Sequence, residues 1–119
     1  MNEVVVYGIP NCDSVRKARN WLAQQGISHR FHDLRRDGVE ATLLHRWLSA
    51  FGWEILLNRR GRTWRQLPAR EREPMDAART QTLMLHEPTI IRRPVIELNG
   101  HAVAVGFDPR RLSTLLVHD

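Results

Sequence analysis

Apolar positions recur along this chain with two different periods, and their order predicts a mixed α/β fold. The β-branched run Val4–Val6, followed by Tyr7 and Gly8, is typical of a buried strand. Helical spacing begins after residue 12, and its apolar face consists of Val15, Ala18, Trp21 and Leu22. Gly26 marks the end of this helix. Residues 28–34 alternate, with Phe31 inward, and predict a second strand. A helical crossover between two strands makes them parallel.

The middle of the chain is predicted to be helical. One apolar stripe is ended by Gly52 and consists of Leu43, Leu44, Trp47, Leu48 and Phe51. A short helix should follow over 53–57, then a loop over 58–62 and a single turn over 63–67. Residues 74–86 predict another helix, with Pro74 near its start and Pro88 beyond its end. The tryptophan and leucine stripes are interpreted as core.

The last part of the chain predicts a hairpin and a helix. Residues 95–98 and 101–105 read as strands, and the Asn99-Gly100 pair between them is a strong signal for a two-residue turn. Asp108 and Pro109 are suited to the cap and first position of a closing helix. The hairpin should complete a sheet in which the first strand is central.

The resulting order, β-α-β, a helical block, then β-β-α, is that of a thioredoxin-like fold. We predict one α/β domain over 1–119, with a mixed sheet, a thioredoxin-like core over 1–36 and 88–119, and a helical insertion over 37–87 between the second and third strands. The length of 119 residues and the 42% of hydrophobic residues are sufficient for such a core.

Composition indicates the cellular compartment in which the protein works. No apolar run approaches the length of about 18 residues that a membrane span requires, so no membrane partner is expected. The start, Met1-Asn2-Glu3, lacks the basic and apolar regions of a signal peptide. A single cysteine excludes an intrachain disulfide, which fits a reducing compartment. We therefore expect a cytoplasmic protein.

The charge balance is basic and almost entirely due to arginine. The net charge is +5, the calculated pI is about 10.9, and Lys17 is the sole lysine. Such a balance suits an anionic partner. The arginines are scattered among acids and form no nucleic-acid motif, so most are interpreted as surface side chains and a nucleic acid is not the expected partner.

The one cysteine, Cys12, is the strongest candidate for chemistry. A lone cysteine is most often a small buried hydrophobe. Cys12, however, follows a turn built on Pro10 and Asn11, and it lies off the apolar face of the helix that it precedes. A sulfur at a helix N-terminus meets free backbone N–H groups and the positive end of the helix dipole, which stabilise a thiolate. We therefore predict a chemical role for Cys12.

The surroundings of Cys12 differ from those of a thioredoxin. A thioredoxin carries Cys-x-x-Cys, whereas Val15 stands at the fourth place here. Chemistry would have to use this single thiol together with an external one.

Three segments in this order resemble the arsenate reductase (ArsC) family, in particular its YffB-like branch, with the Spx regulators as relatives. They are residues 7–18 (YGIPNCDSVRKA), 56–67 (LLNRRGRTWRQL) and 90–94 (IIRRP), and the resemblance spans nearly the whole chain. It implies a thioredoxin-like domain with a helical insertion, and it implies that Cys12 is the nucleophile.

The resemblance also implies an anion-binding set around Cys12. By position, Arg60 and Arg93 match two arginines that bind the oxyanion in arsenate reductases, and Arg16 matches an arginine of the cysteine loop. Guanidinium groups stay charged and hold carboxylates or oxyanions with paired donors. Arg93 precedes Pro94, a proline that is usually cis in the thioredoxin-like class, so we predict a cis bond there. No metal ligand set is expected.

Three departures separate this chain from the arsenate reductases. Gly8 stands where they have a histidine in the first loop, and Asp13 stands where they have a glycine after the cysteine. Their third anion-binding arginine falls near Gly106, where this chain has none. A negative charge beside the thiol would repel arsenate.

These observations lead to an ordered set of functional hypotheses. The first is a thiol/disulfide oxidoreductase in which Cys12 attacks a disulfide and glutathione, the expected co-substrate, resolves the product. The alternatives are an arsenate reductase, a non-enzymatic Spx-like binder of RNA polymerase, and a scaffold with an inert cysteine. The absent third arginine disfavours arsenate reduction, and Val15 removes the two-cysteine switch typical of redox-sensing Spx proteins.

Overall fold

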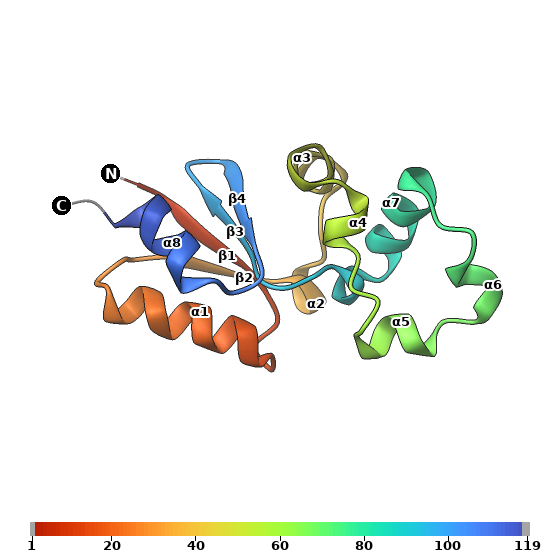
Figure 1. Cartoon of the computed structure of the whole chain (residues 1–119), viewed down its shortest axis with the longest axis horizontal. Helices are drawn as coiled ribbons and strands as arrows, with labels where there is room; N and C mark the ends of the chain where they lie inside the picture. The colour runs from red at the N-terminus through yellow and green to blue at the C-terminus, as the bar shows by residue number, and fades with distance from the viewer. Residues whose placement is uncertain (1, 118–119) are drawn as a thin grey trace. The chain divides into compact units, whose positions relative to one another are not determined.

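The computed structural model describes residues 2–117, and Figure 1 shows its elements. Two compact units make up the chain: one contains the residues up to Asp37 and from Arg93 onward, and the other is Gly38–Arg92. The second unit is the helical insertion. It extends beyond residue 87, at which we expect the insertion to end.

The first unit is built on a four-stranded mixed sheet. The strands are β1 (Val4–Gly8), β2 (Arg30–Asp33), β3 (Val95–Leu98) and β4 (His101–Val105), in the order β2-β1-β3-β4. β1 pairs parallel with β2 and antiparallel with β3, and β3 pairs antiparallel with β4. All five residues of β1 are buried. The prediction of a central first strand, parallel to the second, is therefore confirmed.

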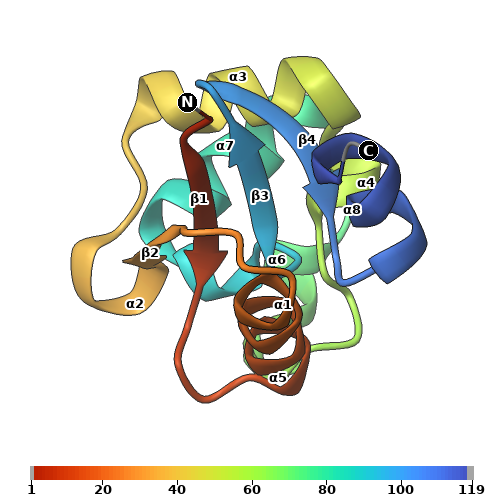
Figure 2. The same cartoon turned by 90° about the vertical axis from the view of Figure 1, so that its left-hand side faces the viewer.

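Two helices cover one face of this sheet, α1 (Asp13–Gln24) and α8 (Pro109–Leu116), both of which face the viewer in Figure 2. Their apolar stripes pack on alternate strand residues because successive strand side chains point to opposite faces. The buried cluster consists of Val4, Val6, Val15, Ala18, Leu22, Ile96, Ala104, Leu112 and Leu116. Phe31 is partly buried against it, on the inward side as predicted.

The other face of the sheet carries a polar pair among buried residues. Glu97, only 2% exposed, accepts a hydrogen bond of 3.3 Å from the hydroxyl of Tyr7. The Tyr7 ring also lies 5.0 Å from the ring of His32 on the neighbouring strand. A buried carboxylate requires such donors, because an unsatisfied one would be expensive to remove from water.

The turns and helix caps lie at the residues that predict them. Gly26, at φ +71°, ends α1, and the N–H groups of Gly26 and Ile27 bond the carbonyls of Ala23 and Leu22. Asn99 and Gly100 both have positive φ, as the two-residue hairpin requires. Asp108 caps α8 by accepting from the N–H groups of Arg110 and Arg111.

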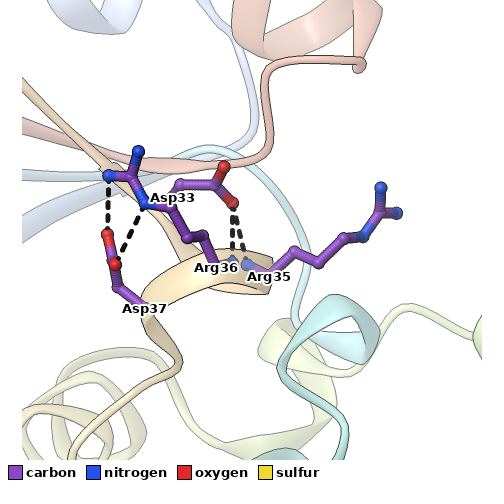
Figure 3. A network of polar contacts seen from close by, with 4 residues as sticks. All are labelled: Asp33, Arg35, Arg36 and Asp37. Atoms are coloured by element: carbon purple, nitrogen blue, oxygen red, sulfur yellow. Dashed lines mark hydrogen bonds and ion pairs between the residues drawn. The ribbon is translucent and has the colours of Figure 1, made fainter.

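The second strand is shorter than predicted. β2 begins at Arg30, and the chain turns into a short helix, α2 (Leu34–Asp37), where the strand was expected to continue to Leu34. Figure 3 shows the reason: an oxygen of Asp33 accepts from the N–H groups of Arg35 and Arg36, at 2.9 and 3.1 Å. This satisfies the free donors of a helix start, while Leu34 is fully buried.

The second unit contains α3 (Ala41–Phe51), α4 (Trp53–Leu56), α5 (Arg62–Gln66), α6 (Ala69–Arg72), α7 (Ala77–His86) and the 3-10 turn η1 (Pro88–Ile90). α6 was not predicted, and α7 begins at Ala77 after its cap, Asp76. Leu57 and Ile91 form an isolated antiparallel bridge. The predicted core stripe is confirmed at Leu44 and Trp47, both fully buried.

Candidate functional site

One end of the sheet gathers the segments that carry the candidate chemistry. The parallel register places Gly8, the last residue of β1, beside Asp33, the last residue of β2. On the other side, Tyr7 pairs with Val95, so the chain reaches Pro94 next to the end of β1. Gly106, after β4, donates its N–H to the Pro94 carbonyl at 2.8 Å. The loop from β1 to Cys12 begins at this same end.

Cys12 is the N-cap of α1, as the sequence predicts. Its backbone is extended, with φ −146° and ψ 124°, and its carbonyl accepts the N–H of Arg16 at 2.9 Å as the first helical hydrogen bond. The thiol is free, half-buried and packed against the core cluster, and it makes no capping hydrogen bond. The sulfur therefore lies at the positive end of a 12-residue helix.

Gly8 fixes how closely this helix approaches the strand before it. A Cβ at Gly8 would lie 2.5 Å from Cγ2 of Val15 and 3.2 Å from its Cγ1. Val15 is fully buried and has a stiff β-branched side chain, so it cannot simply turn aside. The first turn of α1 is thus packed directly on the backbone of β1 at Gly8. The histidine that the family resemblance places at position 8 would not fit without moving this turn.

The exposed side chain of Arg16 contacts two residues of the cysteine loop. Its guanidinium forms an ion pair with Asp13 and also donates to the side chain of Asn11 at 3.4 Å. We predict an anion-binding role for Arg16, but these bonds join it to the two residues that flank Cys12. The pair is exposed, which limits its contribution to stability. Its local effect is to offset the negative charge of Asp13 beside the thiol.

The Arg93–Pro94 bond is cis, as predicted. A second cis bond, at Glu73–Pro74, was not predicted. Arg93 is half-buried and Pro94 is buried. Both belong to the same unit as Cys12, at the sheet end described above. An approach of the Arg93 guanidinium to the thiol stays a prediction.

Arg60 belongs to the second unit and lines a cavity of about 270 Å³ there. Its exposed side chain follows a turn in which its N–H bonds the side chain of Asn58 at 3.0 Å. Arg59 and Arg92 line the same cavity. That Arg60 acts on Cys12 stays a prediction, as does an anion-binding role for it.

Arg59 is the residue that the sequence reasoning missed. We expect Arg59, Arg62 and Arg65 to be ordinary surface side chains, and all three are exposed. The guanidinium of Arg59, however, lies over the rings of Trp53 and Trp64, 5.9 and 5.4 Å from their centroids. These distances are within the range of cation–π attraction. The flanking tryptophans at positions 53 and 64 were the available signal.

A second basic group follows β2 at the sheet end that holds the cysteine loop. In Figure 3, Arg36 reaches Asp37 with two nitrogens, at 3.1 and 2.9 Å, while Arg35 extends away from both acids. The hydrogen bonds from Arg36 hold the pKa of Asp37 below its usual value. Both side chains are exposed, so this pair adds little stability.

Neither a metal-binding cluster nor a membrane-spanning helix is found within residues 2–117. No group of three or more His, Cys, Asp or Glu side chains there is arranged to hold a metal ion. Within the same residues, no helix has both the length and the apolar character needed to cross a membrane.

Comparisons with known proteins agree on one family. The model of the ArsC family matches residues 7–115. An uncharacterized protein of Haemophilus influenzae is 39% identical over 107 residues, which cover 90% of this chain and 93% of that protein. The global transcriptional regulator Spx of Lactiplantibacillus plantarum is 25% identical, covering 94% of this chain and 91% of the regulator.

Two solved structures are similar to this chain in both fold and sequence. A protein described as YFFB superposes with a TM-score of 0.90 at 39% identity, covering 96% of this chain and 99% of that one. An arsenate reductase (ArsC) related protein from Brucella melitensis gives a TM-score of 0.75 at 43% identity, with 98% and 96% covered. These matches, together with the element order, confirm the thioredoxin-like fold.

Proposed function

The chain belongs to the ArsC family, and we propose that it is a glutathione-dependent thiol/disulfide oxidoreductase that uses Cys12 as its single nucleophile. The observation that carries this proposal is the position of Cys12. It is the chain's only cysteine, it is free, and it stands at the N-cap of α1 next to the end of the central strand. A thiolate is the nucleophile in disulfide exchange, and this position favours the thiolate.

The proposed reaction needs one protein thiol, one mixed disulfide that carries glutathione, and one free glutathione. The Cys12 thiolate attacks the glutathione sulfur of a mixed disulfide, and the other thiol leaves as a thiolate that takes up a proton. A second glutathione thiolate then attacks the glutathione sulfur bound to Cys12. Oxidised glutathione leaves and the Cys12 thiolate is restored. In sum, the mixed disulfide and one free glutathione are converted to the released thiol and one molecule of oxidised glutathione.

Residues around Cys12 have separate proposed tasks. The free N–H groups in the first turn of α1 lie at the same end of the helix as the Cys12 sulfur, and they favour a negative charge on that sulfur. Arg16, by pairing with Asp13, limits the opposing effect of that carboxylate. Arg93 would stabilise the thiolate and hold a carboxylate of glutathione. The backbone before Pro94 would add strand-like pairing to the tripeptide, and Arg60 would hold a second carboxylate.

Arsenate reduction is the second candidate, because the chain belongs to the ArsC family and a solved structure 43% identical to it is described as an arsenate reductase (ArsC) related protein. Three features of this site count against it. Asp13 places a carboxylate next to the thiol, and Arg16 is engaged with that carboxylate. The backbone of Gly106, not an arginine, occupies the place near Pro94. A compact oxyanion needs a tight ring of donors.

A regulatory role like that of Spx is the third candidate, supported by the relatives of that name. Val15 counts against a redox switch of the Cys-x-x-Cys type, because it is an apolar side chain fully buried in the core. Binding of RNA polymerase does not require that switch, so it remains an alternative outcome.

The test is turnover. A glutathionylated peptide is supplied together with glutathione, and formation of oxidised glutathione is followed with glutathione reductase and NADPH. We expect turnover by the wild type, none by Cys12→Ser, and unchanged turnover by Arg65→Gln, a surface control. Arsenate should be reduced slowly or not at all in a parallel assay with glutathione and glutaredoxin. Equal rates for wild type and Cys12→Ser, or brisk arsenate reduction, would overturn the proposal.

A further inference from the structure

The sheet of the first unit has two edges that differ in what they can accept. The order β2-β1-β3-β4 makes β2 and β4 the outer strands, and Figure 2 shows β2 beside β1. The pairing of β4 with β3 shifts between Ile96 and Glu97, which indicates a bulge. A bulge twists an edge and discourages the addition of a further strand. β2 pairs with β1 in one unbroken register, so its outer edge is the better template for a further strand.

The pairing of β1 shows which backbone groups of β2 point outward. The N–H of Asn99 bonds the carbonyl of Glu3 at 2.8 Å, so the backbone groups of the odd-numbered residues of β1 face β3. Those of Val6 therefore face β2, where Val6 bonds the two residues that flank its partner, Phe31. The N–H and C=O of Phe31 point away from β1. Among residues 2–117, they form no further hydrogen bond.

The side chain of Arg19 is held over this edge. Its guanidinium carbon lies 4.3 Å from the ring centroid of Phe31, and its Nε donates to Nε2 of His29 at 3.3 Å. Because Phe31 packs on the face that α1 covers, Arg19 lies on that same face. Within residues 2–117, the two terminal nitrogens of Arg19 form no hydrogen bond and no ion pair. Such a pair of nitrogens suits a carboxylate.

We propose that β2 binds an extended acidic segment of a partner protein, which adds a strand to the sheet and places a Glu or Asp opposite Phe31. Side chains directly opposite each other on neighbouring strands share a face and lie about 5 Å apart. The carboxylate would therefore meet the guanidinium of Arg19, while the Phe31 backbone supplies main-chain hydrogen bonds. This surface has no part in the proposed chemistry of Cys12.

A hollow beside the same edge adds a second requirement for the partner. It has a volume of about 430 Å³ and is lined by Ala23, Gly26, Ile27, Ser28 and His29. His29 lies two residues before Phe31, and residues two apart along an extended chain share a face. The partner residue two positions from the acid would therefore face this hollow. Because Ala23 and Ile27 give the hollow apolar surface, an aliphatic side chain fits there.

Charge favours an acidic partner over a second copy of this chain. Two β2 edges paired around a twofold axis would place the two Arg19 guanidinium groups on one face beside each other. Like charges on neighbouring strands are destabilising, and the net charge of +5 adds repulsion between copies. An acidic strand would be attracted by the same groups.

A palindromic peptide tests the edge in either strand direction. The peptide TVTETVT, with both ends blocked, carries a central glutamate and an aliphatic residue two positions away on each side. Its affinity for the full chain is measured by NMR titration, and TVTQTVT is the neutral control. We expect the control to bind about three- to fivefold more weakly, because it loses one partly solvated charge-assisted pair.

Amide hydrogen exchange locates the bound peptide. At saturating peptide, exchange of the Phe31 amide should slow, because its N–H gains a partner. The amides of Arg30 and His32 should change little, because their N–H groups already face β1. This difference between adjacent residues distinguishes strand addition from contact by side chains alone.

Two matched variants test the role of Arg19. Arg19→Gln should bind both peptides with equal affinity, since the main-chain bonds of Phe31 remain and the guanidinium is gone. Arg110→Gln removes an exposed arginine of α8 in the same unit. It should keep the wild-type preference for TVTETVT.

Each contrary outcome overturns the inference. These outcomes are absent binding, equal affinity of the wild type for the two peptides, unchanged exchange at Phe31, and an unchanged preference in Arg19→Gln. Self-association that protects the Phe31 amide without peptide would also overturn it, and would assign the edge to a second copy. A glutathione adduct on Cys12 is measured separately, so failure here and failure of the proposed function are distinguishable.

Discussion

Substitution of Gly8 by alanine should disturb the helix that presents Cys12. The added Cβ would meet Cγ2 of Val15 at 2.5 Å, a distance at which one of the two must move. Val15 is fully buried in the first turn of α1, three residues after the cysteine. The strain would therefore fall on the turn whose N–H groups face the sulfur.

The expected cost follows from the size of this overlap. Overpacking a core by one methyl group costs about 1–3 kcal/mol, and the lower entropy of the unfolded alanine chain offsets about 0.4–1 kcal/mol. We therefore expect Gly8→Ala to lower the free energy of unfolding by about 1–2 kcal/mol, or the midpoint temperature by about 4–8 °C. Reactivity of Cys12 toward iodoacetamide should fall as the helix start is displaced.

A double-mutant cycle makes this reasoning specific. Val15→Ala alone should cost about 2 kcal/mol, because it removes two buried methyl groups and leaves a cavity. In Gly8→Ala/Val15→Ala the new methyl group has room. The double variant should therefore be more stable than the sum of the single changes by about 1–2 kcal/mol. Urea unfolding measures the stabilities, and alkylation of Cys12 should recover in parallel.

Gly26→Ala is the matched control for this cycle. Its φ of +71° also disfavours alanine, but no atom lies within 4 Å of a Cβ there. It should destabilise through backbone strain alone and combine additively with Val15→Ala. Additive behaviour of Gly8→Ala with Val15→Ala would refute the steric explanation.

Three further predictions concern charge. Arg16→Ala should slow the alkylation of Cys12 at neutral pH and Asp13→Asn should accelerate it, because each removes one member of the charged pair beside the thiol; effects of the same sign would contradict this account. Arg93→Ala should also slow the alkylation, and an unchanged rate would show that its guanidinium does not act on Cys12. Burial, chiefly, lowers the pKa of His29 from 6.5, so the unfolded chain takes up this proton first as the pH falls. Stability should therefore decline from pH 7.5 to 5.5 more steeply in the wild type than in His29→Gln, measured by urea unfolding, and parallel declines would contradict the assignment.

Much of the fold could be predicted because local and long-range signals agree. The continuous apolar run at Val4–Val6 belongs to a strand buried on both faces, and Asn99-Gly100 produced the hairpin that this pair favours. The helices α2 and α6 could not be predicted. Each has four residues of which only one is apolar, Leu34 in α2 and Ala69 in α6, so no apolar period can appear.

The candidate site was less predictable than the fold. Cys12 at a helix start follows from local pattern alone, and the structure places it there. The partner of Arg16 was available from sequence as an i, i+3 pair with Asp13, although the pattern does not say which of several interactions a surface arginine makes. The position of Arg59 over Trp53 and Trp64 depends on how α4 and α5 pack, which residue spacing does not determine.

The central claim is that Cys12 is a reactive thiol that exchanges with glutathione, and intact-mass spectrometry after incubation with oxidised glutathione tests it most directly. We expect one glutathionyl adduct per chain, located on Cys12 by peptide mapping, absent in Cys12→Ser, and removed by reduced glutathione with release of oxidised glutathione. The adduct should form faster on the folded protein than on the chain unfolded in urea. An unmodified folded protein, or equal rates in the folded and unfolded chain, would contradict the account.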